Sequence, residues 1–393
     1  MSNKNTAYKI DTAQPIKFID LEVQQKRIRP QIEEALKRVL DHNQYILGPE
    51  VFAFEQALSN FSGAKHSISC ANGTIALSLV LMAKSIGPGD AVFVPTFTFA
   101  ATAEVVASVG ATPIFVDSHP DTFNMDIESL KRQLQEVKKT DLKPKAIIPV
   151  DLFGLPADFD SIEAIASENN LWVLDDAAQA LGATYKEKNI GTLGLATTTS
   201  FFPAKPLGGY GEGGAVFTDD DYLASRIKSL RVHGEGVQKY EYAHIGVNGR
   251  LDTFQAAILI EKLKIFPDEL KARQKVAERY NEALSPYVKT PILPEGYTSS
   301  WAQYTIILPE NNLRDQLITY LKLQGVPTAI YYPIPLHKQP IYQKVSMKTS
   351  ETFSTISDLS QKVLSLPMHP YLDEEAQGYI TSKIIQFFDK SSA

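Results

Sequence analysis

The sequence predicts an α/β fold, with a large domain built on a mostly parallel sheet and a small α+β domain towards the C-terminal end. Between residues 65 and 218, short apolar strands alternate with helical stretches. Several of these strands are apolar on both faces, which is typical of strands that are covered by helices on each side. A chain of 393 residues is also too long for one simple core, and its 44% hydrophobic and 21% charged residues are an ordinary globular balance. We therefore expect two domains.

The elements of the large domain can be placed in chain order. Residues 1–16 are polar and predict a flexible leader without the apolar core of a secretion signal. A helical pattern then runs from about Glu22 to His42, with its apolar residues on one side. The expected strands are HSISC, AVFVP, TPIFVD, KAIIPV, LWVLDD, TTSFF and GAVFT. The helices expected between them are Thr74–Ala83, Ala101–Ser108, Ile127–Val137 and Ser161–Ser167. Since ligands of such sheets bind at the carboxyl ends of the strands, we expect the site there.

The second half of the chain predicts a loop, a long helix and a smaller unit. Residues 233–249 are rich in Gly, Tyr and His and form a long loop, which is more typical of function than of packing. A long helix is expected from about Thr253 to Leu284, followed by a strand (SWAQYTIIL) and a helix (LRDQLITYLKLQG). The predicted organisation is a flexible leader over 1–16, a large domain over 17–255, and a bridging helix with a small C-terminal domain over 256–393.

Composition excludes several classes of protein and site. The net charge of −6 argues against nucleic acid as a partner, because binding the phosphate backbone needs a concentrated basic surface. Cys70 is the single cysteine, so no intramolecular disulfide and no cysteine metal cage can form. The seven histidines show no metal-binding spacing, and no stretch is long and apolar enough for a membrane span. We expect a cytoplasmic protein without a metal site.

The densest chemical information lies between residues 171 and 218. The apolar strand LWVL ends in two adjacent carboxylates, Asp175 and Asp176. A carboxylate at the end of a buried strand must be paired, or desolvation would neutralise it. Further along, Lys205 lies between prolines and glycines after an apolar run. A partly buried lysine at such a turn can have a lowered pKa, which suits an amine that forms a Schiff base.

These residues match the needs of pyridoxal phosphate. The cofactor requires a lysine, a carboxylate facing its pyridinium nitrogen, and a phosphate cradle of backbone N–H groups at a helix start. Asn72-Gly73-Thr74 lies between a strand and a helix and predicts the cradle, to which Ser200 could add a hydroxyl. Either Phe97 or Phe99 could stack on the ring.

Each of these features has a plainer interpretation when it is taken alone. A strand-end aspartate is often a cap or turn residue, a lone lysine is usually exposed, and alternating aromatic residues are usually core. The segment 209–214 (GYGEGG) formally matches a dinucleotide fingerprint, but a strand follows it where a helix is required. Its glycines more simply allow a sharp turn and a close approach of the backbone. The combination of lysine, carboxylate and cradle is what favours a cofactor site.

At DDAAQALGA and SFFPAKPLGGYGEGGA, the sequence closely resembles the DegT/DnrJ/EryC1/StrS family of sugar aminotransferases, and the resemblance runs from FIDLEVQQ to LSLPMHPYLD. It implies a fold-type-I, aspartate aminotransferase-like architecture and a homodimer with shared active sites. Carried over by position, Lys205 is the Schiff-base lysine, Asp176 faces the pyridine nitrogen and Gln179 lies beside the ring hydroxyl. The other implied cofactor-binding positions are Gly73, Thr74 and Ser200 at the phosphate, Phe99 on the ring, and Asn248 reaching in from the partner subunit.

Within the family, RVLDHNQYILGPEV, NGRLDTFQAAIL and PIPLHKQP look most like the branch that aminates UDP-2-acetamido-2-deoxy-3-oxo-glucuronate. This resemblance implies a UDP-linked keto-sugar as substrate, L-glutamate as amino donor and a role in bacterial surface polysaccharide (O-antigen) synthesis. We expect Tyr45, Arg250 and Tyr331 to bind substrate, with Arg250 either holding the uronate carboxylate or, alternatively, pairing with Asp252. Tyr331 stands where that branch is expected to have His, and Gly249 where Ser is common.

Three alternatives remain open from the sequence. A related dehydratase would use the same cofactor but replaces the lysine by histidine, whereas Lys205 is present. A non-catalytic relative would have lost the lysine or the aspartate, and neither is lost here. A 4-keto-6-deoxy or 3-keto-6-deoxy nucleotide sugar is the alternative substrate.

Overall fold

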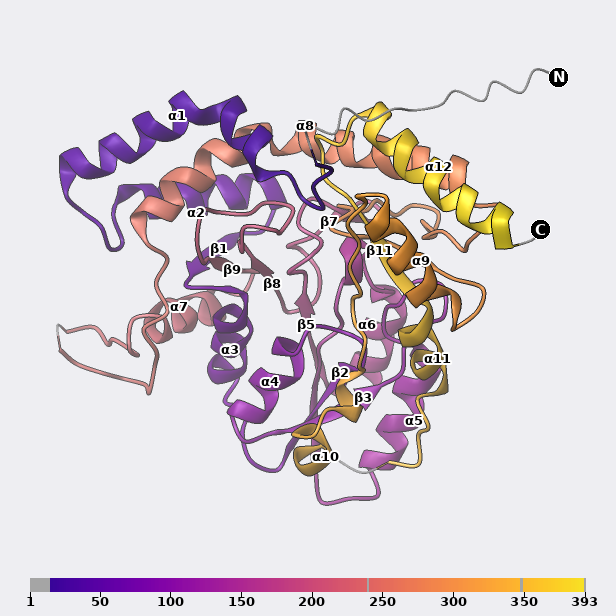
Figure 1. Cartoon of the computed structure of the whole chain (residues 1–393). Coiled ribbons are helices and arrows are strands. Elements are labelled where there is room, and N and C mark those ends of the chain that lie inside the picture. The colour runs from indigo at the N-terminus through magenta and orange to yellow at the C-terminus, as the bar shows by residue number, and fades with distance from the viewer. Residues whose placement is uncertain (1–14, 239, 347–348, 392–393) are drawn as a thin grey trace.

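The centre of the protein is a seven-stranded sheet with the order β1-β9-β8-β5-β4-β2-β3 (Figure 1). The structure is a computed structural model, and it describes residues 15–391 except residues 239 and 347–348. The strands are β1 (His66–Cys70), β2 (Asp90–Pro95), β3 (Thr112–Val116), β4 (Lys143–Ile147), β5 (Trp172–Asp176), β8 (Ala196–Ser200) and β9 (Gly214–Thr218). β3, β2, β4, β5 and β8 are parallel, while β9 pairs antiparallel with both β8 and β1. The prediction of a mostly parallel sheet is confirmed.

Helices cover both faces of the sheet. One face packs against α3 (Gly73–Ala83), α4 (Ala101–Ser108) and α7 (Asp221–Leu230). The other packs against α5 (Ile127–Val137) and α6 (Phe159–Glu168), and its β8-β9-β1 part against α2 (Pro49–Ser62) and the start of α8 (Thr253–Leu284). Adjacent residues of one strand serve the two faces: in β9, Val216 packs towards α3 and Phe217 towards α2. This double cover explains the strands that are apolar on both sides.

Several helices of the large sheet begin at a side-chain cap. The caps of α3, α5, α6 and α7 are Asn72, Asp126, Asp158 and Asp220, and each side chain accepts a hydrogen bond from a backbone N–H of the first turn. Such a cap satisfies one of the N–H groups that have no partner within the helix, and replacing it by alanine typically costs about 1 kcal/mol. The caps fix where each strand-to-helix connection turns, and Asn72 does this at the predicted cradle.

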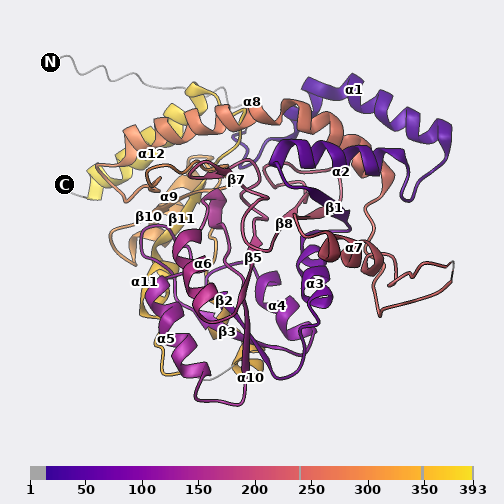
Figure 2. The same ribbon diagram turned by 180° about the vertical axis from the view of Figure 1, so that it is seen from behind.

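The long helix α8 crosses the top of the sheet, with α1 (Leu21–His42) and α2 beside its first half and α12 (Glu374–Ser391) beside its second half (Figures 1 and 2). Both views also show the connection between α7 and α8 projecting from the body beside α7. The predicted helix from Thr253 to Leu284 and the predicted long loop are confirmed.

A second hydrophobic core lies under the second half of α8. It is formed with α12, α9 (Leu313–Leu323) and the antiparallel pair β10 (Tyr304–Ile307) and β11 (Val363–Leu366). α10 (Tyr342–Val345) and α11 (Ser354–Lys362) instead place Tyr342, Ile356 and Leu359 against the core of the large sheet. The domain limits 17–255 and 256–393 remain a prediction, and most of the predicted leader, residues 1–14, lies outside the described residues.

The remaining elements are short. They are the hairpin of β6 (Thr184–Tyr185) and β7 (Lys188–Asn189) and the 3-10 turns η1 (Leu152–Gly154) and η2 (Leu336–Lys338). Within the described part of the chain, no helix combines the length and the apolar character that crossing a membrane requires.

Candidate active site

The carboxyl end of β5 presents Asp176 to one face of the sheet and Asp175 to the other, because consecutive strand residues alternate. Asp176 is buried, and its Oδ2 accepts a hydrogen bond of 2.8 Å from Thr102 Oγ1 at the start of α4. The backbone N–H of Ala178 lies 3.3 Å from Oδ1. Burial raises the pKa of Asp176, while these two donors and the charge of Lys205 act in the opposite direction. The carboxylate is thus held, with donors, at the edge where ligands of parallel sheets bind.

Lys205 lies in a tight turn between β8 and β9. Its backbone N–H donates to Phe202 O at 2.8 Å, and Gly209 N donates to Phe201 O at 2.7 Å to close the turn. Burial lowers the pKa of the Lys205 amine, and the nearby charge of Asp176 raises it in part. An amine with a lowered pKa is unprotonated more often and is therefore a better nucleophile.

The start of α3 forms a cradle in which glycine is required. A Cβ on Gly73 would lie 2.8 Å from Ser200 Cβ, and a Cβ on Gly214 would lie 2.5 Å from the carbonyl carbon of Asn72. Such distances do not occur between real side chains, so this approach of three backbone segments depends on the two glycines. Asn72 Oδ1 accepts from Ile75 N at 2.8 Å, which leaves the N–H groups of Gly73 and Thr74 at the helix start available to an anion. Together with the Ser200 hydroxyl, the cradle suits a phosphate group.

Gln179 is held from both ends of its side-chain amide. Its Oε1 accepts from Phe153 N at 2.7 Å, and its Nε2 donates to the Tyr332 hydroxyl at 3.3 Å. Phe97 is buried and makes edge contacts with the Tyr332 and Phe153 rings, whereas Phe99 is 58% exposed. Of the two phenylalanines that the sequence left open, Phe99 is therefore the one free to stack on a ring, and Phe97 belongs to the core.

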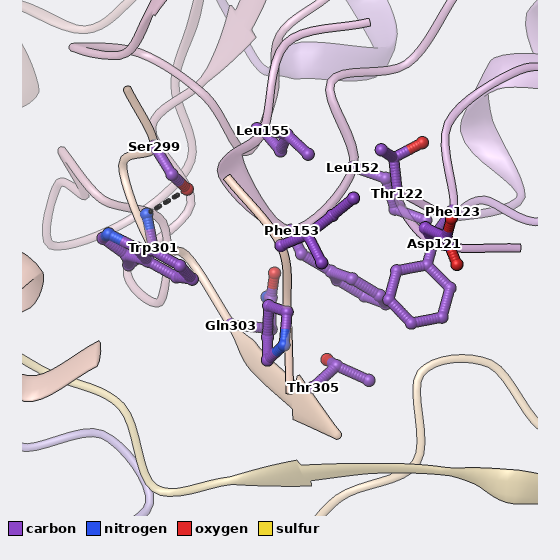
Figure 3. Close-up of a pocket in the computed structure, with 12 residues that line it drawn as sticks. Asp121, Thr122, Phe123, Leu152, Phe153, Leu155, Ser299, Trp301, Gln303 and Thr305 are labelled. Atoms are coloured by element: carbon purple, nitrogen blue, oxygen red, sulfur yellow. Dashed lines mark hydrogen bonds between the residues drawn. The ribbon is translucent and has the colours of Figure 1, made fainter. Parts of the chain in front are cut away.

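A cavity behind Gln179 separates the large sheet from the segment that leads to β10. It is lined on one side by residues 121–123, Leu152, Phe153 and Leu155, and on the other by Pro291, Ile292, Ser299, Trp301, Gln303 and Thr305 (Figure 3). Ser299 Oγ accepts from Trp301 N at 3.0 Å, the contact dashed in Figure 3, and Ser300 Oγ donates to Gln179 O at 2.6 Å. Neither Lys205 nor Asp176 lines this cavity. Phe153, which lines the cavity, donates to Gln179, so the cavity lies behind the candidate site.

The loop before α8 docks onto the cradle. Ala71 N donates to Gly249 O at 2.9 Å, and Gly249 N donates to Arg231 O at 2.9 Å. A Cβ on Gly249 would lie 3.0 Å from Ile75 Cγ2, so a serine here would require a small shift of the Ile75 side chain. On either side of this glycine, Asn248 is exposed and Arg250 is half-buried.

The predicted substrate residues have different surroundings. The buried Nε of Arg250 has no hydrogen-bond partner, and no ion pair joins Arg250 to Asp252 in the described part of the chain. Tyr45 stacks on Phe254, and its carbonyl accepts from Thr253 N at 3.0 Å, so it lies beside the start of α8. Tyr331 is half-buried and contacts Tyr332, which places it next to Gln179.

Comparison with known proteins identifies the family of the chain. Residues 26–385 match the DegT/DnrJ/EryC1/StrS aminotransferase family. The chain belongs to this family. It is 48% identical over 361 residues to the UDP-2-acetamido-2-deoxy-3-oxo-D-glucuronate aminotransferase of Pseudomonas aeruginosa, covering 91% of this chain and 96% of that protein.

Two further comparisons agree with this family. The UDP-N-acetyl-3-dehydro-alpha-D-glucosamine 3-aminotransferase of Acidithiobacillus ferrooxidans is 40% identical over 371 residues, which cover 94% of this chain and 97% of the relative. A crystal structure of a DegT/DnrJ/EryC1/StrS aminotransferase from Brucella abortus superposes with a TM-score of 0.92 at 49% identity, covering 95% of this chain and 99% of that one. The chain is thus a PLP-dependent aminotransferase of fold type I, as predicted.

The residues of this sugar aminotransferase fit the cofactor that the family uses. The narrow cradle of Gly73, Thr74 and Ser200, the amine of Lys205 with its lowered pKa, and the buried Asp176 supply the three features that pyridoxal phosphate needs. In the part of the chain that the structure describes, no cluster of His, Cys, Asp and Glu is placed to hold a metal ion.

The structure adds residues that the sequence reasoning missed. Thr102 and Tyr332 contact Asp176 and Gln179 directly. Arg231 is buried and donates from Nη1 to Glu55 and, at 2.6 Å, to Ser69 O. Because Arg231 also holds Gly249 through its carbonyl, this buried ion pair connects α2, the end of β1 and the docked loop. No short motif marks these residues, since the partners of their side chains lie 74 to 176 positions away.

Proposed function

We propose that this aminotransferase transfers an amino group from L-glutamate to UDP-2-acetamido-2-deoxy-3-oxo-D-glucuronate and so makes the 3-amino sugar acid of a bacterial surface polysaccharide such as O-antigen. The observation that carries the choice of a uronate is Arg250, which keeps a buried Nε without a partner on the loop that docks at the cradle. A guanidinium in this state can bind a carboxylate with two parallel hydrogen bonds. The 48% identity to the Pseudomonas aeruginosa enzyme, whose named substrate is this uronate, supports the same choice.

The proposed roles of the cofactor-binding residues follow from their positions. When bound, pyridoxal phosphate supplies an electron sink for the carbon that gains or loses the amino group. Gly73, Thr74 and Ser200 bind its phosphate, and Asp176 with its Thr102 donor balances the charge of the ring nitrogen. Phe99 covers one face of the ring and Gln179 lies at its hydroxyl. These residues fix the cofactor relative to Lys205.

Lys205 is the proposed catalytic residue. Its Nζ would hold the cofactor, and as a free amine it would move the proton between the two carbons that exchange it during amino transfer. Its lowered pKa suits both tasks, because the same amine must accept and return a proton near neutral pH. Tyr45, Arg250 and Tyr331 are proposed to bind the substrate.

A homodimer with shared active sites completes the proposal. Asn248 is exposed although its neighbour Gly249 is fixed against the cradle, so its side chain is available to a second subunit. We propose that Asn248 binds the cofactor phosphate in the partner's site.

A second candidate substrate is a neutral UDP-linked 3-keto sugar. The Acidithiobacillus ferrooxidans relative, whose named substrate lacks the uronate carboxylate, favours this possibility. A 4-keto-6-deoxy or 3-keto-6-deoxy sugar nucleotide remains a further alternative. None of these sugars carries the uronate carboxylate, so with each of them Arg250 would be left without a carboxylate partner.

An amination assay with L-glutamate separates these substrates. The purified protein is offered the 3-oxo-uronate, the neutral 3-keto sugar, each linked to UDP, and a dTDP-linked 4-keto-6-deoxy sugar, and kcat/KM is compared. We expect the uronate to be preferred by about 10-fold to 100-fold, the discrimination that one charge-assisted hydrogen-bonded group supplies. Preference for a neutral sugar would refute the uronate assignment.

A further inference from the structure

Two further aspartates lie behind Asp176, the carboxylate at the candidate cofactor site, and most of their oxygens lack a hydrogen-bond donor. Asp151 and Asp175 are both 0% exposed. Asp151 Oδ1 accepts from Ala157 N at 2.8 Å, but Asp151 Oδ2 and both oxygens of Asp175 have no hydrogen-bond partner in the described part of the chain. Three of the four carboxylate oxygens are therefore buried and unmatched. Buried polar groups are nearly always hydrogen-bonded, so this cluster requires a physical explanation.

The two aspartates face each other beside the end of β5. Asp151 follows β4, and its backbone N–H donates to Asp176 O at 3.1 Å, while Asp176 N donates to Pro149 O at 3.0 Å. Asp175 lies on the opposite face of β5 from Asp176. Because Val150 pairs with Asp176, the next residue, Asp151, lies on the same side as Asp175, and the two carboxyl groups interact closely enough for one proton to join them. The pair is thus built into the backbone that positions Asp176.

Two ionised carboxylates in this place would be prohibitively unstable. Each would lose its hydration without gaining a donor, and they would repel each other and Asp176. One shared proton removes this instability. It makes one carboxyl group a donor and the other its acceptor, and so satisfies two of the three unmatched oxygens. Thr197 of β8 is paired with Asp175 in the sheet, but its hydroxyl donates to Leu193 O at 3.2 Å, so one oxygen of the pair stays without a donor.

We propose that Asp151 and Asp175 share a proton at neutral pH and act as a positioning pair, which holds the end of β5 in place and leaves Asp176 as the ionised carboxyl. The claim that Asp176 is the ionised carboxyl rests on the proposed role of Asp176, whereas the shared proton does not. Burial, increased by the neighbouring carboxylates, raises the pKa of Asp151 to about 8 and that of Asp175 above its ordinary value. The charge of Asp176, the next residue of the same strand, acts on both members of the pair from the other face of β5, and the charge of Lys205 acts on Asp176.

The shared proton makes folding stability depend on pH. The unfolded chain releases it near the ordinary aspartate pKa of 3.8, whereas the folded chain keeps it up to about pH 8. The proton therefore contributes its whole stabilisation of the fold below the pKa of the unfolded chain. That stabilisation is lost as the pH rises towards and through the pKa of the folded chain. Between them, one retained proton lowers the folding equilibrium constant about tenfold per pH unit.

The first test compares the unfolding of the full-length protein across this pH range. Asp151→Asn and Asp175→Asn each replace the shared proton by a permanent amide donor, and Asp141→Asn, at an exposed aspartate before β4, is the matched control. We expect both variants to lose most of the tenfold-per-unit dependence, while the control keeps the slope of the wild type. Wild-type slopes in both Asn variants would overturn the proposal.

The second test does not depend on the variants folding. Infrared spectra of the wild-type holoenzyme at neutral pH, with and without 13C-labelled aspartate, should show a protonated carboxyl band that shifts with the label. The same band should be absent from the single Asn variants if they fold. A wild type without any protonated aspartate would refute the shared proton whatever the enzyme aminates, and a protein that aminates no sugar but shows the band would refute only the proposed function.

Discussion

At the scale of single residues, the chemistry depends on the two groups that modify each other across the candidate site. Burial lowers the pKa of Lys205 and raises that of Asp176, and each charge partly offsets the effect on the other. Each charge therefore favours the other, while burial of Lys205 favours the neutral amine that can act as a nucleophile and a base.

Lys205 should carry the cofactor. The purified protein is expected to be yellow, and reduction with borohydride should fix the cofactor to one peptide, which contains Lys205. Lys205→Ala should bind the cofactor without a covalent link and lose amino transfer by several orders of magnitude. Lys262 is a suitable control lysine, since it is also buried and its pKa is lowered to about 8. A label on Lys262, or on any other lysine, would contradict the assignment.

Thr102 should set the acid limit of activity through Asp176. Thr102→Val removes the 2.8 Å donor to Oδ2 at nearly constant volume, and such a bond to a charged group contributes about 1.5–3 kcal/mol. The pKa of Asp176 should then rise by about one to two units, because the ionised form loses a donor. The acid limb of kcat/KM against pH should move upwards accordingly. Thr102→Ser keeps the hydroxyl and should restore the wild-type limb; a general loss of activity at every pH would indicate a structural role only.

Arg250 should matter most for the charged sugar. Arg250→Lys keeps the charge but cannot form two parallel hydrogen bonds with a carboxylate, so use of the 3-oxo-uronate should weaken by about 1.5–3 kcal/mol. Use of a neutral UDP-linked 3-keto sugar should change less. The half-reaction with glutamate is measured separately, because the donor also carries carboxylates. Equal losses with the charged and neutral sugars would argue against contact between Arg250 and the uronate.

At the scale of elements, the cradle is a meeting of α3, β8 and β9 that tolerates no added methyl group. Gly73→Ala places a Cβ 2.8 Å from Ser200 Cβ, and overpacking of this kind typically costs about 1–3 kcal/mol. Cofactor affinity should fall by about 10-fold to 100-fold, measured by reconstitution of the apoprotein. Gly87→Ala is a matched control, because its Cβ would lie 3.8 Å from the nearest atom. Unchanged affinity in Gly73→Ala would place the phosphate elsewhere.

Most elements of the large domain could be predicted because each carries its own pattern. α4, α5 and α8 have the bounds that periodicity indicated, and α2, which the sequence reasoning passed over, also has Val51, Phe54 and Leu58 at helical spacing. The end of β4 was misplaced: KAIIPV predicted a strand to Val150, whereas β4 ends at Ile147. Pro149 has no N–H for the ladder, and Val150 pairs with Asp176 only as an isolated bridge.

The candidate site could be predicted only in part, for a reason of topology. Lys205, Asp176 and the Gly73-Thr74 cradle are marked by local signals, namely a Gly/Pro turn, a strand end and a strand-to-helix turn. The contact of Thr102 with Asp176 depends instead on the order β2-β4-β5, and that of Tyr332 with Gln179 on how the C-terminal half folds back. Neither arrangement is encoded by the spacing of residues along the chain.

At the scale of the whole molecule, several exposed apolar side chains support the proposed homodimer. They lie on α1, on α2, between these helices, and on the loop beside α7 that projects in both views (Figures 1 and 2), and they are Leu40, Tyr45, Ile46, Phe52, Val237 and Ile245. Exposed apolar side chains often mark an interaction site, and an isologous two-fold contact would bury those of each subunit against its partner. The same contact would bring each docked loop, with Asn248, towards the other subunit.

Mixing two inactive variants should therefore restore activity if Asn248 acts across the interface. In a hybrid of Lys205→Ala and Asn248→Ala subunits, the site that keeps Lys205 would receive Asn248 from the partner and would be intact. Random exchange makes about half of the dimers hybrid, each with one working site, so about a quarter of wild-type activity should return. A mixture of Lys205→Ala with Asp176→Ala is the control, because both residues belong to one subunit's site and no hybrid site can be complete. If the first mixture recovers no more than the control, Asn248 serves its own subunit. The loop would then bind the phosphate from the same side on which Ala71 already holds Gly249.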